Sequence, residues 1–461
     1  MGGKRGEFET IKGNFRRTNN PIRFNFRKAC ASWSWAKRSD VYTHQIHNYP
    51  AKVLAYIPIY FLSTENFCPK NEKVLDCFTG SATVLLECLV NGNIKRNCLG
   101  VEINPLARLI AKVKVTPLDL KKLSEEKDKL FNRIGSTKEV NIQKFRNIDF
   151  WFSHKAQKDL TKIKIAIQQT NNRDIQDFFW VCFSSVIRKC SYADPHIPPP
   201  VIFKVKDNMK NKEKVQLMIK EKQNPHCFEY FKEAIENNLI RIEKLNGVDE
   251  VYSGKVDCKI IWDDARDIKV SKMVGRGMLD KTNFQKLKDE SIGMIITSPP
   301  YIAAQKYVRT TTLEMFWLDL INKESLKDLD KNNIGTERVL KDEEGSIVPE
   351  FLKRDFKIIE KINSKRAQIV LRYFKDMNEI MKNAYRILKK GRYFILVLGN
   401  NRVCGRIIKN HKFLSKLGEE AGFKTEAILV DKIRSRGMIT KRNKTAGIIR
   451  DEYILILKKD S

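Results

Sequence analysis

Two parts of the chain alternate short, continuous apolar runs with stretches of helical periodicity. In the first part, the pattern predicts a strand at 74–78, a helix at 82–89 that turn residues end, and a second strand at 98–103. In the second part it predicts four more strands and one amphipathic helix followed by Gly391, with the strands at 260–262, 293–297, 393–398 and 453–457 and the helix at 373–388. The sequence therefore predicts an α/β fold with a doubly wound, Rossmann-like sheet.

Between these parts the pattern is different. Charge-rich amphipathic helices without strand alternation are expected at 118–133, 155–169, 175–189 and 228–245. The first forty residues are basic and aromatic without clean periodicity, so we expect the core to begin after them. The predicted organisation has four parts, which are a basic N-terminal arm (1–40), a cofactor-binding part (41–116), a helical insertion (117–255) and a catalytic part (256–461).

The composition is that of a globular protein. The chain has 461 residues, of which 42% are hydrophobic, while 22 Gly and 14 Pro exclude collagen-like and low-complexity classes. No apolar run is long enough to span a membrane and no signal-peptide core follows the start, so we expect a cytoplasmic protein without a membrane partner. Ten cysteines without a C-x-x-C spacing favour reduced thiols over disulfides or a zinc ribbon.

A formal net charge of +32 suggests a polyanion as partner, and nucleic acid is the leading candidate. The alternative is that a Lys-rich composition is general to the source organism and carries no functional meaning. One basic cluster has the same two interpretations, a clamp for DNA phosphates or a solvated face, and consists of Arg434, Arg436, Lys441, Arg442 and Lys444.

The first candidate site follows the strand at 74–78. A strand that ends in Asp76 and leads through Phe78, Gly80 and Ser81 into a helix places backbone amides at the carboxyl edge of the sheet. The next strand ends in Glu102, whose carboxylate could accept both hydroxyls of a ribose. The glycine patterns of pyrophosphate-binding loops are absent. A nucleoside cofactor without a pyrophosphate, S-adenosylmethionine, fits best.

The second candidate site follows the strand at 293–297 and has the residues Thr297, Ser298, Pro299, Pro300 and Tyr301. Two prolines make this corner rigid and leave carbonyl oxygens as acceptors, while Tyr301 offers a ring for stacking on a base. Acceptors aimed at an exocyclic amine would favour the tetrahedral nitrogen that can attack a sulfonium methyl. The target base must then leave the duplex.

These residues resemble the motifs of amino-group DNA methyltransferases, and the T-S-P-P-Y form resembles that of the cytosine-N4 type. Asp76-x-Phe78-x-Gly80-Ser81 resembles the cofactor motif of this family. Two further segments extend the resemblance, the one with Tyr49 and Pro50, which in the family lies beside the methionine end of the cofactor, and Asp264-Ala265-Arg266, whose acid in the family meets the adenine. The resemblance implies a methyltransferase sheet, catalysis by residues 298–301 and the modification half of a restriction system, with an endonuclease as a further partner.

Several alternatives stay open at this point. The same chemistry serves adenine N6, an RNA amino group could replace the DNA base, and a catalytically silent nucleic-acid-binding protein could keep the fold. The cofactor loop has Ala82 where the family commonly has glycine, and the insertion at 117–255 is only a possible target-recognition region. His44 and His47 lack further ligands nearby in the sequence, so we expect no metal. Arg309 and Tyr307 could line the target pocket, although helix packing is the favoured interpretation for Tyr307.

Overall fold

The computed structural model describes residues 2–31, 41–50, 52–91, 94–194, 197, 199–205, 212–302, 307–338, 347–433 and 450–460. Its centre is an eight-stranded sheet. From one edge to the other, the strands are β1 (Ile22–Arg23), β11 (Phe423–Lys432), β12 (Asp451–Lys459), β8 (Leu388–Gly399), β7 (Ile292–Thr297), β2 (Val74–Asp76), β3 (Cys98–Val101) and β4 (Cys258–Trp262). The predicted α/β class and doubly wound sheet are confirmed.

The strands from β4 to β8 are parallel, and only β12 runs against its neighbours. Val74 of β2 pairs with Cys98 of β3 on one side and with Met294 of β7 on the other, so the strand order reverses direction at β2. Parallel strands end at the same edge of a sheet, and ligands bind where the order reverses. The ends of β2 and β7 are therefore the place to look for a site.

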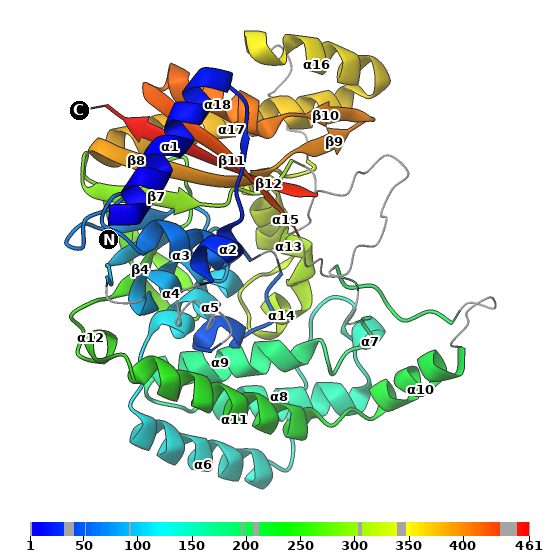
Figure 1. Ribbon diagram of the computed structural model, residues 1–461. Helices are drawn as coiled ribbons and strands as arrows, with labels where there is room; N and C mark the ends of the chain where they lie inside the picture. Colours follow the sequence, from blue (N-terminus) through cyan, green and yellow to red (C-terminus); the bar gives the residue numbers. More distant parts are fainter. Residues whose placement is uncertain are drawn as a thin grey trace.

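Helices cover the sheet because its strands are buried on both faces. Near β3 and β4 lie α3 (Tyr56–Leu62), α4 (Thr83–Val90) and α5 (Pro105–Val115), whereas α16 (Glu350–Ile362), α17 (Ser364–Ile387) and α18 (Asn410–Glu420) gather at the opposite end of the molecule (Figure 1). A small hairpin of β9 (Asn401–Val403) and β10 (Arg406–Ile408) follows β8. None of the described helices is long and apolar enough to cross a membrane.

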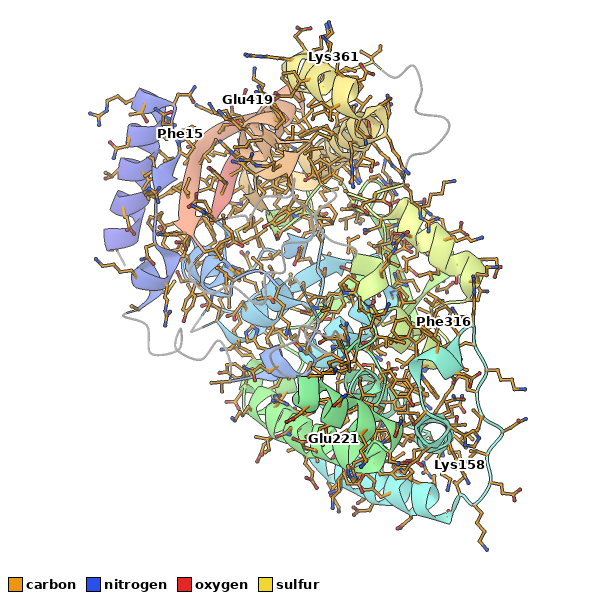
Figure 2. The ribbon with its side chains drawn as sticks, turned by 90° about the vertical axis from the view of Figure 1, so that its right-hand side faces the viewer. Phe15, Lys158, Glu221, Phe316, Lys361 and Glu419 are labelled. Carbon is orange, nitrogen blue, oxygen red and sulfur yellow. The ribbon has the colours of Figure 1, made fainter. Side chains whose placement is uncertain are left out.

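The segment between β3 and β4 is helical, as predicted, and forms the lower part of the molecule in Figure 1. After α5, its helices are α6 (Leu120–Ser136), α7 (Ile148–Trp151), α8 (His154–Gln168), α9 (Arg173–Ile187), α10 (Lys212–Gln223), α11 (Cys227–Asn246) and α12 (Asp249–Tyr252). They form a second core around Trp180, Phe183 and Phe231, which also includes Trp317 of α14 (Thr312–Trp317). Figure 2 shows Lys158 and Glu221 in this part and Phe15 and Glu419 in the sheet-bearing part.

The expectation that the core begins after residue 40 is wrong for residues 2–31. Helix α1 (Gly2–Thr18) packs on β11 and buries Phe8, Ile11 and Phe15, while β1 extends the sheet and α2 (Phe26–Cys30) packs near α3. Arg16 of α1 pairs with Glu426 of β11. The N-terminal segment is therefore part of the sheet-bearing body rather than an arm.

Two other details differ from the sequence prediction. Strands β5 (Lys269–Gly275) and β6 (Met278–Lys286) form a hairpin between β4 and β7 that the sequence pattern did not indicate. Helix α17 ends at Ile387, and Gly391, with a φ of 73°, lies inside β8 rather than ending the helix. Between β7 and α16 lie α13 (Tyr307–Thr310), α14 and α15 (Lys323–Asn332).

Candidate active site

Asp76 is the last residue of β2, and its carboxylate is buried. Its Oδ1 accepts hydrogen bonds from the Phe78 amide at 3.1 Å and from the Thr297 hydroxyl at 2.5 Å. Burial raises the pKa of Asp76 to about 7, because the charged carboxylate loses water, although the two hydrogen bonds oppose the shift. The first motif is thus connected directly to the end of β7.

The second motif leaves the sheet at this same point. Pro299 is buried, whereas Ser298, Pro300 and Tyr301 are half-buried. The loop at Gly335 packs against the corner so closely that a Cβ there would come within 3.0 Å of the Tyr301 carbonyl oxygen. The Asn401 amide donates to the carbonyl oxygen of Ile302 at 3.2 Å. These contacts hold the end of the corner, from Pro300 to Ile302, in place.

The turn between β2 and α4 has an unusual backbone. Gly80 has a φ of 51° with nothing within 4 Å of the position of a Cβ, and Ala82 has a φ of 60° in the left-handed region. For a residue with a side chain that conformation costs about 1–2 kcal/mol. The fully buried Lys114 donates from Nζ to the Ser81 carbonyl oxygen at 2.6 Å and helps to hold the turn. Ala82, at the position where the resembled family commonly has glycine, therefore has a strained backbone conformation.

Glu102 follows β3 and faces the same turn. Its Oε2 accepts from the Gly80 amide at 2.7 Å, and its Oε1 accepts from the Asn104 amide at 2.8 Å. Burial raises the pKa of Glu102, while these amides and the nearby Arg108 oppose the rise. Each carboxylate oxygen keeps a second lone pair, so Glu102 can still accept hydroxyl groups of a ligand.

Asp264 follows β4 and borders a cavity of about 490 Å³ between the strand ends, the β5–β6 hairpin and α15. The cavity is lined by both polar and apolar side chains. The apolar ones include Ile103, Trp262, Met278 and Leu329. Arg266 binds both oxygens of Asp264, with Nε 3.0 Å from Oδ1 and a terminal nitrogen 3.0 Å from Oδ2. Asp264 thus borders this cavity but already has an ionic partner.

The segment around Tyr49 also lies near this edge of the sheet. Tyr49 is buried, Pro50 is half-buried, and the Tyr49 hydroxyl lies 3.4 Å from the side-chain amide of Asn104. His44 forms a buried contact with Glu87, with Nε2 and Oε1 2.7 Å apart. Burial lowers the pKa of His47 to about 3. Among the residues with described positions, no three His, Cys, Asp or Glu side chains cluster as a metal site would require.

The structure therefore brings the two motifs and Glu102 together, with Thr297 of the second motif connecting them. It also adds Asn104, which the sequence analysis did not select. Asn104 caps α5 through its side chain and donates to Thr311. The Asn104–Pro105 pair is a helix-start signal that could have drawn attention to this position. The basic cluster at 434–444 lies outside the described residues, as does the Tyr307 side chain, and Arg309 lies 3.9 Å from Asp330.

The chain is similar along most of its length to a Type II methyltransferase, M.MvaI of Kocuria varians. The two are 28% identical over 450 residues, which cover 90% of this chain and 91% of that protein. M.AvaI of a Nostoc species, another Type II methyltransferase, is 32% identical over 154 residues, or 30% of this chain and 32% of that protein. No family model matches the chain.

Among solved structures, TTHA0409 of Thermus thermophilus, assigned as a DNA modification methylase and complexed with S-adenosyl-L-methionine, is 14% identical. The match covers 38% of this chain and 48% of that chain, with a TM-score of 0.19. A TM-score this low does not establish a shared fold, so the fold of this chain is described from its own strand order.

Proposed function

We propose that this protein is a Type II DNA methyltransferase that transfers a methyl group from S-adenosylmethionine to the exocyclic N4 amine of cytosine. Similarity to M.MvaI over nine tenths of both chains supports methyl transfer as the reaction class. The observation that carries the proposal is the junction of two sites, because the Thr297 hydroxyl links the end of β7 to Asp76 at the end of β2. A cofactor held at one strand end would there face a base held at the other.

The residues around β2 and β3 fit the cofactor. Glu102 has lone pairs for ribose hydroxyls, Gly80 leaves open space beside the turn, and the cavity bordered by Ile103 and Asp264 can take an adenine ring. The Ser81 hydroxyl is buried without a hydrogen-bond partner in the described part of the chain, so a polar ligand group could satisfy it. We place Tyr49 and Pro50 beside the methionine end. When bound, S-adenosylmethionine supplies an electrophilic methyl group on its sulfonium.

The residues after β7 would receive the target base. Ser298 and the carbonyl oxygens of the proline corner can accept both hydrogens of an exocyclic amine, which frees the nitrogen lone pair for attack. The ring of Tyr301 can stack on the extruded base and offset part of the few kcal/mol that unstacking costs. This scheme requires no strong base, because geometry and hydrogen bonding activate the exocyclic amine.

The charge and the helical segment complete the proposal. A net charge of +32 favours a long polyanion over a single small substrate. We assign target recognition to residues 117–255 because their described helices form a separate core, and α9 of this core packs on α5, the helix that follows Glu102. In a restriction-modification system the protein would act beside a cognate endonuclease.

The direct test is to identify the product. Purified protein, labelled S-adenosylmethionine and duplex DNA of mixed sequence should give labelled N4-methylcytosine after digestion to nucleosides. Label in N6-methyladenine would keep the reaction class and change the base. Label in RNA alone, or no transfer despite cofactor binding, would contradict the proposal. Ser291→Ala, at the other end of β7, should leave transfer unchanged and serves as the control for variants of Ser298.

A further inference from the structure

The buried side chain of Arg108 on α5 connects three backbone carbonyl groups at the edge of the cavity. One terminal nitrogen donates to the Glu102 carbonyl oxygen at 2.9 Å and to the Ile103 carbonyl oxygen at 2.9 Å. Its Nε donates at 2.5 Å to the carbonyl oxygen of Gly277, in the turn of the β5–β6 hairpin. Arg108 is 5% exposed, and burial lowers its pKa even though Asp263 and Glu102 lie nearby.

The Glu102 and Ile103 carbonyl groups lie beyond the end of β3, where they have no neighbouring strand of the described chain as a hydrogen-bond partner. The Glu102 amide still donates to the Trp262 carbonyl oxygen at 3.1 Å, but β3 itself ends at Val101. Without Arg108, the Glu102 and Ile103 carbonyls would lose these partners in a part-buried position. An unsatisfied carbonyl costs about 1–3 kcal/mol where it is fully buried, and less where water reaches it. Arg108 therefore continues the hydrogen bonding of the strand and fixes the peptide that carries the Glu102 side chain.

The hairpin turn approaches α5 without spare room. Gly277 has a φ of 75°, and a Cβ at this position would lie only 2.0 Å from the Pro105 carbonyl oxygen. Only glycine fits there, because both the backbone conformation and the space exclude a side chain. The close approach lets the Gly277 carbonyl reach Arg108, and it places Met278 in the wall of the cavity.

We propose that Arg108 is a positioning residue for the cofactor. By holding the Glu102 and Ile103 peptides against the hairpin turn, it sets the direction of the Glu102 carboxylate and the position of the Ile103 wall. Its desolvated positive charge also favours the ionised form of Glu102, which is the form that accepts hydrogen bonds from ribose hydroxyls. This inference rests on the proposed cofactor site.

The geometry requires arginine rather than any cation. A guanidinium presents five donors in a planar fork, whereas a lysine ammonium is a single point with three donors on a flexible stem. Lysine can keep the charge near Glu102 but cannot hold three carbonyls in these directions. The Arg108→Lys variant therefore separates orientation from charge, and Arg108→Met removes both.

The experiment measures S-adenosylmethionine binding by calorimetry and methyl transfer to duplex DNA with the full-length chain. Arg108→Lys should raise the Kd and the KM for the cofactor about tenfold, equivalent to the loss of one buried hydrogen bond, and Arg108→Met should raise them further. At saturating cofactor, kcat should stay within about twofold of wild type, because Arg108 touches no reacting atom.

Arg96→Lys is the matched control. Arg96 is 1% exposed and likewise donates to backbone carbonyls, those of Cys68, Leu62 and Thr64, but outside the candidate site. The Arg96→Lys variant should have a lower melting temperature than wild type and an unchanged cofactor affinity. Gly277→Ala should weaken cofactor binding from the hairpin side, whereas Gly391→Ala, also at positive φ but in open space, should not.

The outcomes distinguish a positioning role of Arg108 from a purely structural one. If Arg108→Lys binds the cofactor as tightly as wild type, or if Arg96→Lys weakens binding equally, Arg108 has only a structural role. If Arg108→Met fails to fold, Arg108→Lys and Gly277→Ala carry the same test. A wild-type chain that binds no S-adenosylmethionine would instead contradict the proposed function, so the two failures are distinguishable.

Discussion

The hydroxyl group of Thr297 lies between the two motifs, donating to Oδ1 of Asp76 at 2.5 Å and accepting from the Phe78 amide at 3.0 Å. Thr297 is 1% exposed, so both bonds are shielded from bulk water. One side chain at the end of β7 thus fixes both the carboxylate that ends β2 and the Phe78 amide in the turn that follows β2.

Replacing this hydroxyl should affect stability and cofactor binding together. Thr297→Val leaves Asp76 with fewer donors, so we expect the free energy of unfolding to fall by about 1–3 kcal/mol at pH 8. The loss should be smaller at pH 5, because Asp76, with a pKa of about 7, is then protonated. Urea denaturation at both pH values measures this. Thr297→Ser, which keeps the hydroxyl, should behave like wild type, and equal losses in both variants would mean that the methyl group matters instead.

Gly80 should tolerate alanine poorly for two separable reasons. Its φ of 51° makes Gly80→Ala cost about 1–2 kcal/mol of stability, and the added methyl group would enter the space assigned to the cofactor. Gly391→Ala has a similar backbone penalty and open surroundings. We expect comparable losses of stability by denaturation but weaker S-adenosylmethionine binding only for Gly80→Ala. Unchanged calorimetric affinity in Gly80→Ala would move the cofactor away from this turn.

Ser298 and Glu102 should fail in different ways. Ser298→Ala removes the acceptor that we propose for the target amine, so kcat should fall at least about tenfold while the cofactor Kd changes little. Glu102→Ala removes the acceptor that we propose for the ribose, so the cofactor Kd should rise first. Steady-state kinetics and calorimetry on both variants check this order. The reverse order would mean that the two roles are wrongly assigned.

Glu314 of α14 should make stability depend on pH. It is 6% exposed, its Oε2 has no hydrogen-bond partner within the described residues, and burial raises its pKa to about 7. Since the folded-state pKa lies above the ordinary value of 4.5, the group costs nothing in stability below pH 4.5. Its cost grows as the pH rises towards 7 and stays constant above that.

The Glu314→Gln variant should therefore gain stability relative to wild type between pH 5 and pH 8, on the order of 3 kcal/mol at the upper end. Urea titrations at several pH values measure the difference. Asp76 and Glu452, whose pKa values also rise to about 7, stay in both proteins and cancel from the comparison. If the difference in the free energy of unfolding between the variant and wild type stays constant across this pH range, the pKa of Glu314 is not raised by burial.

The central elements were predictable because local pattern and packing agree there. The strand before Asp76, the strand before Ser298 and the helix before Asn91 are continuous apolar segments with turn residues behind them. Their convergence also followed from the sequence, since parallel strands share one edge. Cofactor and target roles for these residues stay predictions.

Other parts depended on contacts that a sequence pattern does not contain. Phe8, Ile11 and Phe15 have helical spacing, but many charged neighbours concealed the helix that they bury against β11. Gly391 is typical of a helix end, yet Leu388 already pairs with Ile292 in the sheet. The roles of Arg108 and Lys114 depend on backbone carbonyls distant in sequence, which no local pattern reveals.

The bond between Asp76 and Thr297 spans 221 positions of the chain, and the helical segment lies between them. Closing a loop of that length costs about 5 kcal/mol of chain entropy, which only the completed β2–β7 pairing can offset. During synthesis, the turn after β2 leaves the ribosome long before its partner strand exists. The nascent polypeptide consequently cannot form the Asp76–Thr297 junction until β7 has emerged, and we expect this pairing late in folding.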